Sequence, residues 1–256
     1  MLTNPYDYER QHSLSHFYHE APQMTNQTTT FDDHDPLANH ILTVLEDFID
    51  EIGARECTAH FDTVIDGKYF LKGQHLIQKP ERFIEDHLVF PLLKHALGYS
   101  LRPQPKQYAP RWPRGSGIPD FAITTIPIQA AMQHDIRFFG EVKPPKKIDN
   151  ARTDMQAYLD SDLDIHAVAL LSDGFDWELW IRPKGQPTAD LDNPVQQASL
   201  RNPLKTVRTR NMETTSYRPH TVRNNINTEA FTQFTADAVL DMIETEFDLS
   251  VTSLRH

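Results

Sequence analysis

The sequence IRFFGEVK, residues 136–143, joins an apolar run to a glutamate and a lysine. A run of aromatic and β-branched side chains of this length predicts a buried β-strand. Strand side chains alternate between the two faces of a sheet, so Glu141 and Lys143 share one face while Val142 points into the core. The stretch therefore predicts a strand that presents a carboxylate and an amine together at its carboxyl end.

Neighbouring stretches predict the rest of the fold around this strand. Apolar runs predict strands at residues 121–128, 165–171 and 175–181. Periodic patterns predict helices at residues 36–53, 80–99, 153–160 and 228–247, the second kinked by Pro91 and the last capped by Thr228. A hairpin is expected over residues 57–71, and irregular chain over residues 100–117 and 183–226. This order predicts an α/β (α+β) fold in which a central mixed β-sheet is flanked by helices, with terminal helical additions.

Changes in composition divide the chain into four segments. Residues 1–34 are polar without an apolar period, which predicts a mobile arm. Residues 35–79 would form a helix and hairpin extension, and residues 80–182 the core. Residues 183–256 would form a basic irregular segment followed by the C-terminal helix.

The composition also limits the class of protein. With 39% hydrophobic residues among 256, most of the chain is expected to be globular. No apolar run approaches the ~18 residues of a membrane span, so no membrane partner is expected. The single cysteine, Cys57, excludes an internal disulfide and a cysteine-based zinc cluster. It indicates a reducing, intracellular (cytoplasmic) setting.

Charge is unevenly distributed along the chain. The net charge of −11 argues against a nucleic-acid partner, but acidic residues are concentrated in residues 31–66 and 229–248. Basic residues gather in residues 99–119 and 201–223. A phosphate backbone responds to the local field, so these basic stretches are candidate DNA-binding segments; ordinary solvated surface is the alternative. The candidate DNA contacts are Arg102, Lys106, Arg111, Arg114, Lys146 and Lys147.

Two carboxylates and a lysine form the candidate site. Asp120 follows Pro119 at the start of one expected strand, and Glu141 and Lys143 end the next. If the two strands pair, Asp120 and Glu141 lie side by side, where their oxygens suit Mg²⁺. The cation would offset charge on a phosphoryl group and lower the pKa of water, while Lys143 would position that water and add positive charge. The structural alternative is a turn aspartate beside an exposed strand pair.

At these residues the chain resembles the PD-(D/E)xK nuclease superfamily, and more narrowly the N-terminal endonuclease domain of type I restriction enzyme motor (R) subunits. The resemblance covers about residues 80–182. It includes a glutamate-bearing helix ending in LGY at 97–99, the strands already described, and a turn SDG at 172–174 before a strand containing tryptophan. In the family's Gln-x-x-x-Tyr helix motif, Tyr158 matches and Asp154 stands in the glutamine position.

The resemblance implies a restriction-endonuclease-like core and a metal-dependent endonuclease that hydrolyses DNA phosphodiester bonds. The products would carry a 5′-phosphate and a 3′-hydroxyl. The resemblance implies that Asp120, Glu141 and the main-chain carbonyl of Val142 bind Mg²⁺, with Mn²⁺ able to substitute. It implies that Lys143 is the catalytic lysine and that DNA is the partner. A homodimer is left open, because many such nucleases cut both strands as dimers.

Two further residues have roles under this resemblance. Glu85 would be an auxiliary acid that reaches the metal through water, and Glu81, one helical turn earlier, is the alternative. Tyr158 would position the phosphate or the lysine, or would simply pack at the helix end.

Two other functions stay open from the sequence. The overall acidity and the aspartate at position 154 favour a catalytically silent nuclease-fold module that binds DNA or a protein partner. The acidic helix at residues 36–53 would instead suit a DNA mimic or a protein-interaction factor.

Overall fold

A mixed sheet lies at the centre of the computed structural model, which describes residues 35–56, 78–103, 119–160, 162–188, 193–212, 226–249 and 254. The sheet has six strands in the order β1-β2-β3-β4-β5-β6. β3 and β4 are parallel, and the other neighbouring pairs are antiparallel. The strands are β1 (Leu101–Pro103), β2 (Phe121–Ile123), β3 (Ile136–Val142), β4 (His166–Ser172), β5 (Asp176–Arg182) and β6 (Gln196–Ser199).

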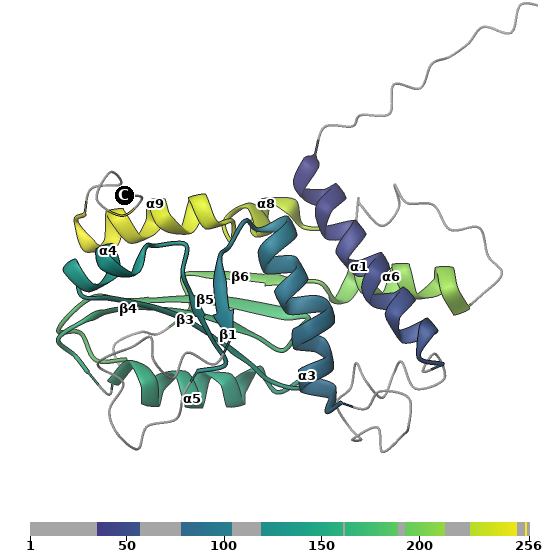
Figure 1. The fold of residues 1–256 in the computed structure, drawn as a ribbon, viewed down its shortest axis with the longest axis horizontal. Coiled ribbons are helices and arrows are strands. Elements are labelled where there is room, and N and C mark those ends of the chain that lie inside the picture. Colours follow the sequence, from purple (N-terminus) through teal and green to yellow (C-terminus); the bar gives the residue numbers. More distant parts are fainter. Residues whose placement is uncertain are drawn as a thin grey trace, which may run out of the picture. The chain divides into compact units, whose positions relative to one another are not determined.

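Helices cover both faces of this sheet (Figure 1). α5 (Ile148–Asp160) lies below the strands in this view, and α4 (Ile128–Gln133) and α9 (Ala236–Phe247) lie above them. None of the helices in the described ranges is both long and apolar enough to cross a membrane. The remaining helices are α1 (Pro36–Ala54), α3 (Pro80–Ile84) with its continuations η2 (Glu85–Val89) and η3 (Leu92–Ala96), α6 (Arg201–Met212) and α8 (Thr228–Thr232).

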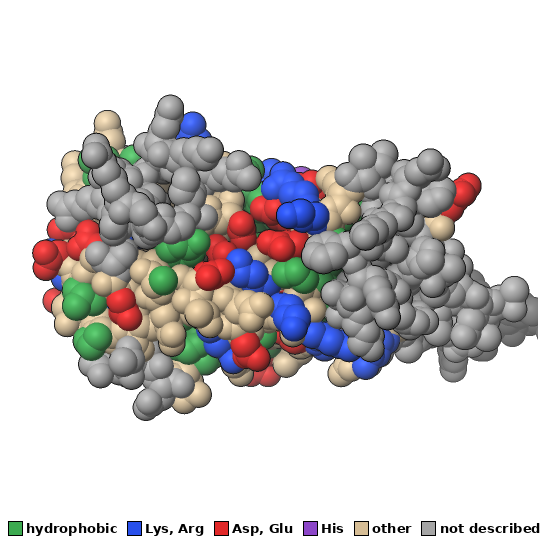
Figure 2. All heavy atoms as spheres, turned by 90° about the horizontal axis from the view of Figure 1, so that it is seen from below, with side chains coloured by type: hydrophobic (Ala, Val, Ile, Leu, Met, Phe, Trp, Pro, Cys, Tyr) green, Lys and Arg blue, Asp and Glu red, His purple; other side chains and the backbone are tan. Residues whose placement is uncertain are grey.

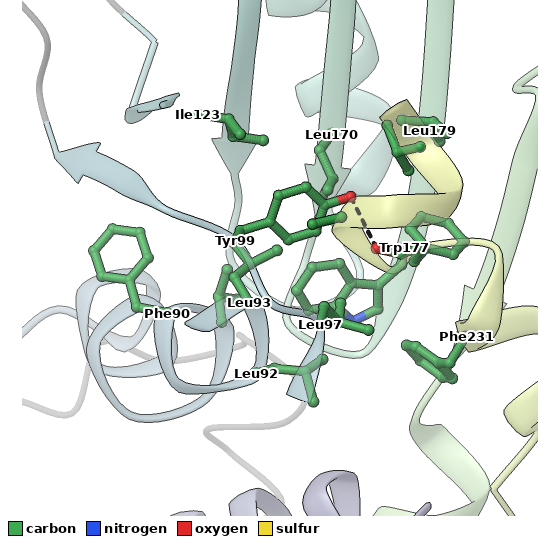
Figure 3. Close-up of a cluster of buried hydrophobic side chains, with 14 of the residues drawn as sticks. Phe90, Leu92, Leu93, Leu97, Tyr99, Ile123, Leu170, Trp177, Leu179 and Phe231 are labelled. Carbon is green, nitrogen blue, oxygen red and sulfur yellow. Dashed lines mark hydrogen bonds between the residues drawn. The ribbon is translucent and has the colours of Figure 1, made fainter. Parts of the chain in front are cut away.

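Two apolar clusters form the core. Phe138 belongs to the larger cluster and its neighbour Phe139 to the smaller one, as expected for alternating strand side chains. The smaller cluster lies between the sheet and α5. In the larger cluster, the hydroxyl of Tyr99 donates to the main-chain oxygen of Phe234 at 2.8 Å, beside Trp177 (Figure 3). The larger cluster includes residues of α1, the helix at 80–96, the strands, α8 and α9, so these elements share one core.

Several elements begin where the sequence predicts. β3 has the predicted bounds, and α1 starts at Pro36 as predicted. α3 starts at Pro80, the predicted start of the helix at 80–99. The mixed sheet flanked by helices is also confirmed. The hairpin predicted at 57–71 and the arm predicted at 1–34 lie outside the described residues.

Four predictions about the type or bounds of an element are wrong. Residues 101–103 form β1 instead of loop, because their backbone pairs with β2. The strand predicted at 121–128 stops at Ile123, and α4 follows Pro127, which has no N–H to donate to a sheet. Residues 183–226 include β6 and α6, whose mostly polar sequences carry little apolar period. α5 begins at Ile148, five residues before its predicted start at 153.

The C-terminal helix is also divided, which corrects the prediction of a single helix capped by Thr228. The Asn227 side chain accepts from the Ala230 amide and caps α8. Thr235 accepts from the Ala238 amide and starts α9 as a new N-cap. A threonine side chain at this position satisfies a free amide and so favours a second helix start over continuation.

The helix at residues 80–96 continues through Pro91 by widening its turns. Pro91 keeps helical dihedrals of φ −58° and ψ −44°. Beyond it, the Leu97 amide donates to the Leu92 carbonyl five residues back, at 3.0 Å. Proline lacks an N–H and crowds the preceding turn, and π-helical turns absorb such a break. Gly98, with φ +79°, then ends the helix in the left-handed region.

Close packing at Gly140 yields a stability prediction. A Cβ at Gly140 would lie 1.9 Å from the Phe121 ring. We therefore expect Gly140→Ala to lower the free energy of unfolding by about 1–3 kcal/mol, as overpacking does. The control is Gly53→Ala, where nothing lies within 4 Å, and which should leave stability unchanged or raise it by up to about 1 kcal/mol. Urea denaturation measures both, and equal effects of the two changes would contradict the packing explanation.

Candidate functional site

The start of β2 and the carboxyl end of β3 lie together. The two strands are antiparallel with Phe121 opposite Gly140, which places Asp120 beside the end of β3. Asp120 Oδ2 accepts a hydrogen bond from the Val142 amide at 2.7 Å. Since Glu141 directly precedes Val142, the register brings Asp120 to the strand segment that carries Glu141.

Lys143 lies between two carboxylates on the α5 face of the sheet. Its Nζ is 2.5 Å from Glu141 Oε1 and 2.8 Å from Asp154 Oδ2. The side chain of Glu141 is 3% exposed and that of Asp154 is 47% exposed. Buried Met155 helps to hold this part of α5 against the sheet. Val142 packs into the larger core cluster, so the predicted alternation along β3 is confirmed.

One oxygen of Glu141 has no partner. Glu141 Oε2 is buried and makes no hydrogen bond within the described part of the chain. Burial, reinforced by the charge of Asp120, raises the pKa of Glu141 to about 7, although the hydrogen bond from Lys143 acts in the opposite direction. Burial also raises the pKa of Asp120, against the hydrogen bond from the Val142 amide. An unpaired buried polar atom costs about 1–3 kcal/mol, so a bound partner at this oxygen would stabilise the protein.

A second buried glutamate on the same row of the sheet is fully paired. Leu171 lies opposite both Glu141 on β3 and Glu178 on β5. Glu178 Oε2 accepts from Arg152 Nε at 2.9 Å and from Trp180 Nε1 at 3.0 Å. Its Oε1 accepts from Arg152 Nη2. The same face of the sheet therefore buries one glutamate with both oxygens paired and another with one oxygen unpaired.

The two helix acids lie within the field of this cluster. Glu85 is 6% exposed, and its Oε2 accepts from Arg82 Nη1 at 2.6 Å. Burial raises the pKa of Glu85 to about 7; Arg82 opposes this shift and Asp120 adds to it. Burial also raises the pKa of Glu81. The positive charge of Lys143 opposes this shift, and the negative charge of Asp120 adds to it. The negative charge of Asp120 therefore raises the pKa of both acids, and Glu85 is the more deeply buried of the two.

Tyr158 combines packing with proximity to the charged groups. Its ring meets Phe139 edge-on, with 5.7 Å between ring centroids and a 90° angle between the planes. Burial raises the pKa of Tyr158 to about 12, and the charges of Glu141 and Asp154 add to the shift. The packing role considered from the sequence is present, on the same side of the sheet as Glu141.

Three of the candidate DNA contacts are described, and all three are exposed. Arg102 lies on β1, and Lys146 and Lys147 lie in the turn between β3 and α5. Figure 2 views the molecule from below Figure 1, and shows acidic and basic side chains mixed across the middle of this face. The other candidates, which lie outside the described residues, are Lys106, Arg111 and Arg114.

The structure adds Asp173, which sequence reasoning did not single out. Asp173 is fully buried in the β4–β5 turn, and its Oδ2 accepts from the Lys146 amide at 2.6 Å and from Arg201 Nη2 at 2.8 Å. Aspartate in a turn often binds nearby amides, and its Oδ1 does so with Phe175 at 3.0 Å. Its link to the lysine-bearing loop depends on tertiary packing, for which the sequence carries no local signal.

The oxygen donors around Glu141 are of the type that binds Mg²⁺. No group of three or more His, Cys, Asp or Glu side chains in the described ranges is arranged to hold a metal ion. Mg²⁺ keeps several waters and often takes only one or two protein carboxylates. Asp120, Glu141 with its unpaired oxygen, and the main-chain carbonyl of Val142 offer hard oxygen donors of the kind Mg²⁺ prefers. The residues present therefore fit such an ion.

No protein-family model matches this chain, and no curated protein or solved structure is similar enough to count as a match. Function is therefore inferred from the geometry and charge of the cluster around Glu141.

Proposed function

We propose that this chain is a metal-dependent endonuclease of the PD-(D/E)xK, restriction-endonuclease-like type, which hydrolyses phosphodiester bonds in DNA. The unpaired, buried Oε2 of Glu141 carries the proposal, because a divalent cation would supply the partner it lacks. Burial raises the pKa values of Asp120, Glu85 and Glu141 together. A cation relieves such a concentration of buried carboxylates, whereas the arginine-paired Glu178 needs none.

Asp120 and Glu141 would hold Mg²⁺ or Mn²⁺, with the carbonyl of Val142 as a further oxygen donor. The bound cation would stabilise negative charge on the phosphoryl oxygens and make water more acidic. Burial favours a neutral amine at Lys143, but its hydrogen bonds to Asp154 and Glu141 raise the pKa of Lys143 above its ordinary value. Lys143 would therefore act as a cation that orients the phosphate and water, and not as a general base.

The surroundings suit a DNA backbone. Lys146 and Lys147 are exposed within four residues of Lys143, where they would add phosphate contacts. The lysine-bearing loop is held by the bond between the Lys146 amide and Asp173, which would keep these charges close to the cluster. A second copy of the chain would allow both strands of a duplex to be cut.

Metal-dependent cleavage tests this proposal. Purified protein should nick or cut DNA with Mg²⁺ or Mn²⁺ and lose that activity with EDTA. Lys143→Met should lower the cleavage rate by about 100-fold or more, the usual cost of removing one group that stabilises transition-state charge, while DNA binding persists. The matched control is Lys184→Met, at a lysine that pairs with Asp135 on the surface, and it should stay within about twofold of wild type. Undiminished cleavage by Lys143→Met would reject the site.

One observation favours a catalytically silent nuclease-fold module instead. Lys143 is bound by two carboxylates, Glu141 and Asp154, which already offset its charge. Such a module would bind DNA or a protein without a cation. Isothermal titration with Mn²⁺ separates the two functions, because only the nuclease needs Asp120-dependent metal binding.

A further inference from the structure

The position of Asp154 suggests a role beyond pairing with a lysine. Glu141 Oε1 holds Lys143, and Oε2 of the same carboxylate is the unpaired oxygen proposed to bind the cation. The ammonium of Lys143 and the cation would therefore share one carboxylate, and like charges so close repel. A second carboxylate that retains Lys143 would release Glu141 for the metal.

We propose that Asp154 is a positioning residue that holds Lys143 in place while Glu141 gives its carboxylate to a divalent cation. This inference rests on the proposed function. Asp154 Oδ2 already lies 2.8 Å from Lys143 Nζ. Lys143 could therefore leave Glu141 and stay bound to Asp154 without a large movement of either chain segment.

Asp154 is suited to this role by its exposure and its support. Its side chain is 47% exposed to water, whereas that of Glu141 is 3% exposed. The helix that presents it is fixed on the sheet by Ala151, Met155 and Leu159, all buried in the smaller cluster. A fixed backbone with a solvated carboxylate makes a stable second partner for the ammonium.

The charge of Asp154 is what matters in this role. A neutral amide at this position would still offer an oxygen to Lys143, but would not offset its positive charge. An ammonium has three donors, and Glu141 and Asp154 account for two of them in the described structure. When Lys143 stays on Asp154 alone, the other two donors are left for the phosphate and water.

A double-mutant cycle on Mn²⁺ affinity tests the role, with Mn²⁺ alone as the probe in isothermal titration. Asp154→Asn should weaken Mn²⁺ binding about fivefold or more, because Glu141 is then the one carboxylate bound to Lys143 that offsets its positive charge. In a Lys143→Met background, the same change should alter the affinity by less than about twofold, because no lysine competes. Lys143→Gln replaces Lys143→Met if thermal unfolding shows that the methionine variant is not folded.

Asp149→Asn is the control for general charge loss. Asp149 lies on the same helix, is 82% exposed and pairs with Arg152, so its removal should leave Mn²⁺ affinity unchanged. An equal loss with and without Lys143, or no loss at all, would overturn the role of Asp154.

Failure of the proposed function gives a different result. If wild type does not bind Mn²⁺, or Asp120→Asn binds it equally well, the metal site itself is wrong and the Asp154 role is rejected with it. If wild type binds and Asp120→Asn does not, but Asp154→Asn shows no lysine-dependent loss, only the positioning role is rejected.

Discussion

Glu141→Gln should abolish DNA cleavage without destabilising the metal-free protein. We expect a rate loss of about 1000-fold or more, because the change removes a ligand charge from a cation worth several kcal/mol to the reaction. The metal-free variant should be at least as stable as wild type near pH 8, since glutamine removes a buried carboxylate whose pKa burial raises to about 7. Loss of activity with unchanged or raised stability is the signature of a residue retained for function.

Single-turnover cleavage rates and urea denaturation near pH 8 with EDTA measure the two halves of this prediction. Glu178 provides the matched control, because Arg152 and Trp180 donate hydrogen bonds to its carboxylate. A change at Glu178 should lower stability, whereas Glu141→Gln should not. Glu178→Gln removes the charge from a partly buried ion pair and should lower stability by about 1–3 kcal/mol. If Glu141→Gln destabilises the protein as much as Glu178→Gln does, Glu141 is a structural residue and the metal proposal loses its main support.

The parts of the site that follow from local rules were predictable. β3 has an uninterrupted apolar run, so its bounds and the shared face of Glu141 and Lys143 could be read from alternation alone. Asp120 could be placed because β2 and β3 pair as neighbouring strands. These inferences need only the period of a strand and the pairing of adjacent segments.

The parts that depend on long-range packing were not predictable. The contact between Asp154 and Lys143 requires α5 to cover the carboxyl end of β3, and no local pattern in the helix sequence indicates which strand it covers. α6 was missed because its buried apolar positions, Leu204 and Val207, supply too little of a period within a basic sequence. Short or polar elements that are stabilised by distant partners leave little local pattern.

The buried acids also make stability depend on pH in an unusual direction. Glu85 and Glu141 each have a pKa raised to about 7 by burial, whereas an unfolded glutamate titrates near ~4.3. The folded state therefore binds protons more tightly than the unfolded state between these values. Their stabilising contribution is complete below the unfolded pKa and is lost as the pH rises through about 7. His87 and His166 oppose this trend, because burial lowers the pKa of each.

The metal-free protein should accordingly lose about 3 kcal/mol of unfolding free energy between about pH 5.5 and pH 8, and saturating Mn²⁺ should restore a similar amount near pH 8. Urea denaturation in EDTA and in Mn²⁺ at three pH values measures both effects. A double variant, Glu85→Gln with Glu141→Gln, should flatten the pH dependence and remove most of the gain from Mn²⁺, since the charges that the cation relieves are gone. Stability that rises with pH, or a Mn²⁺ gain that survives in the double variant, would place the proton and metal linkage elsewhere in the chain.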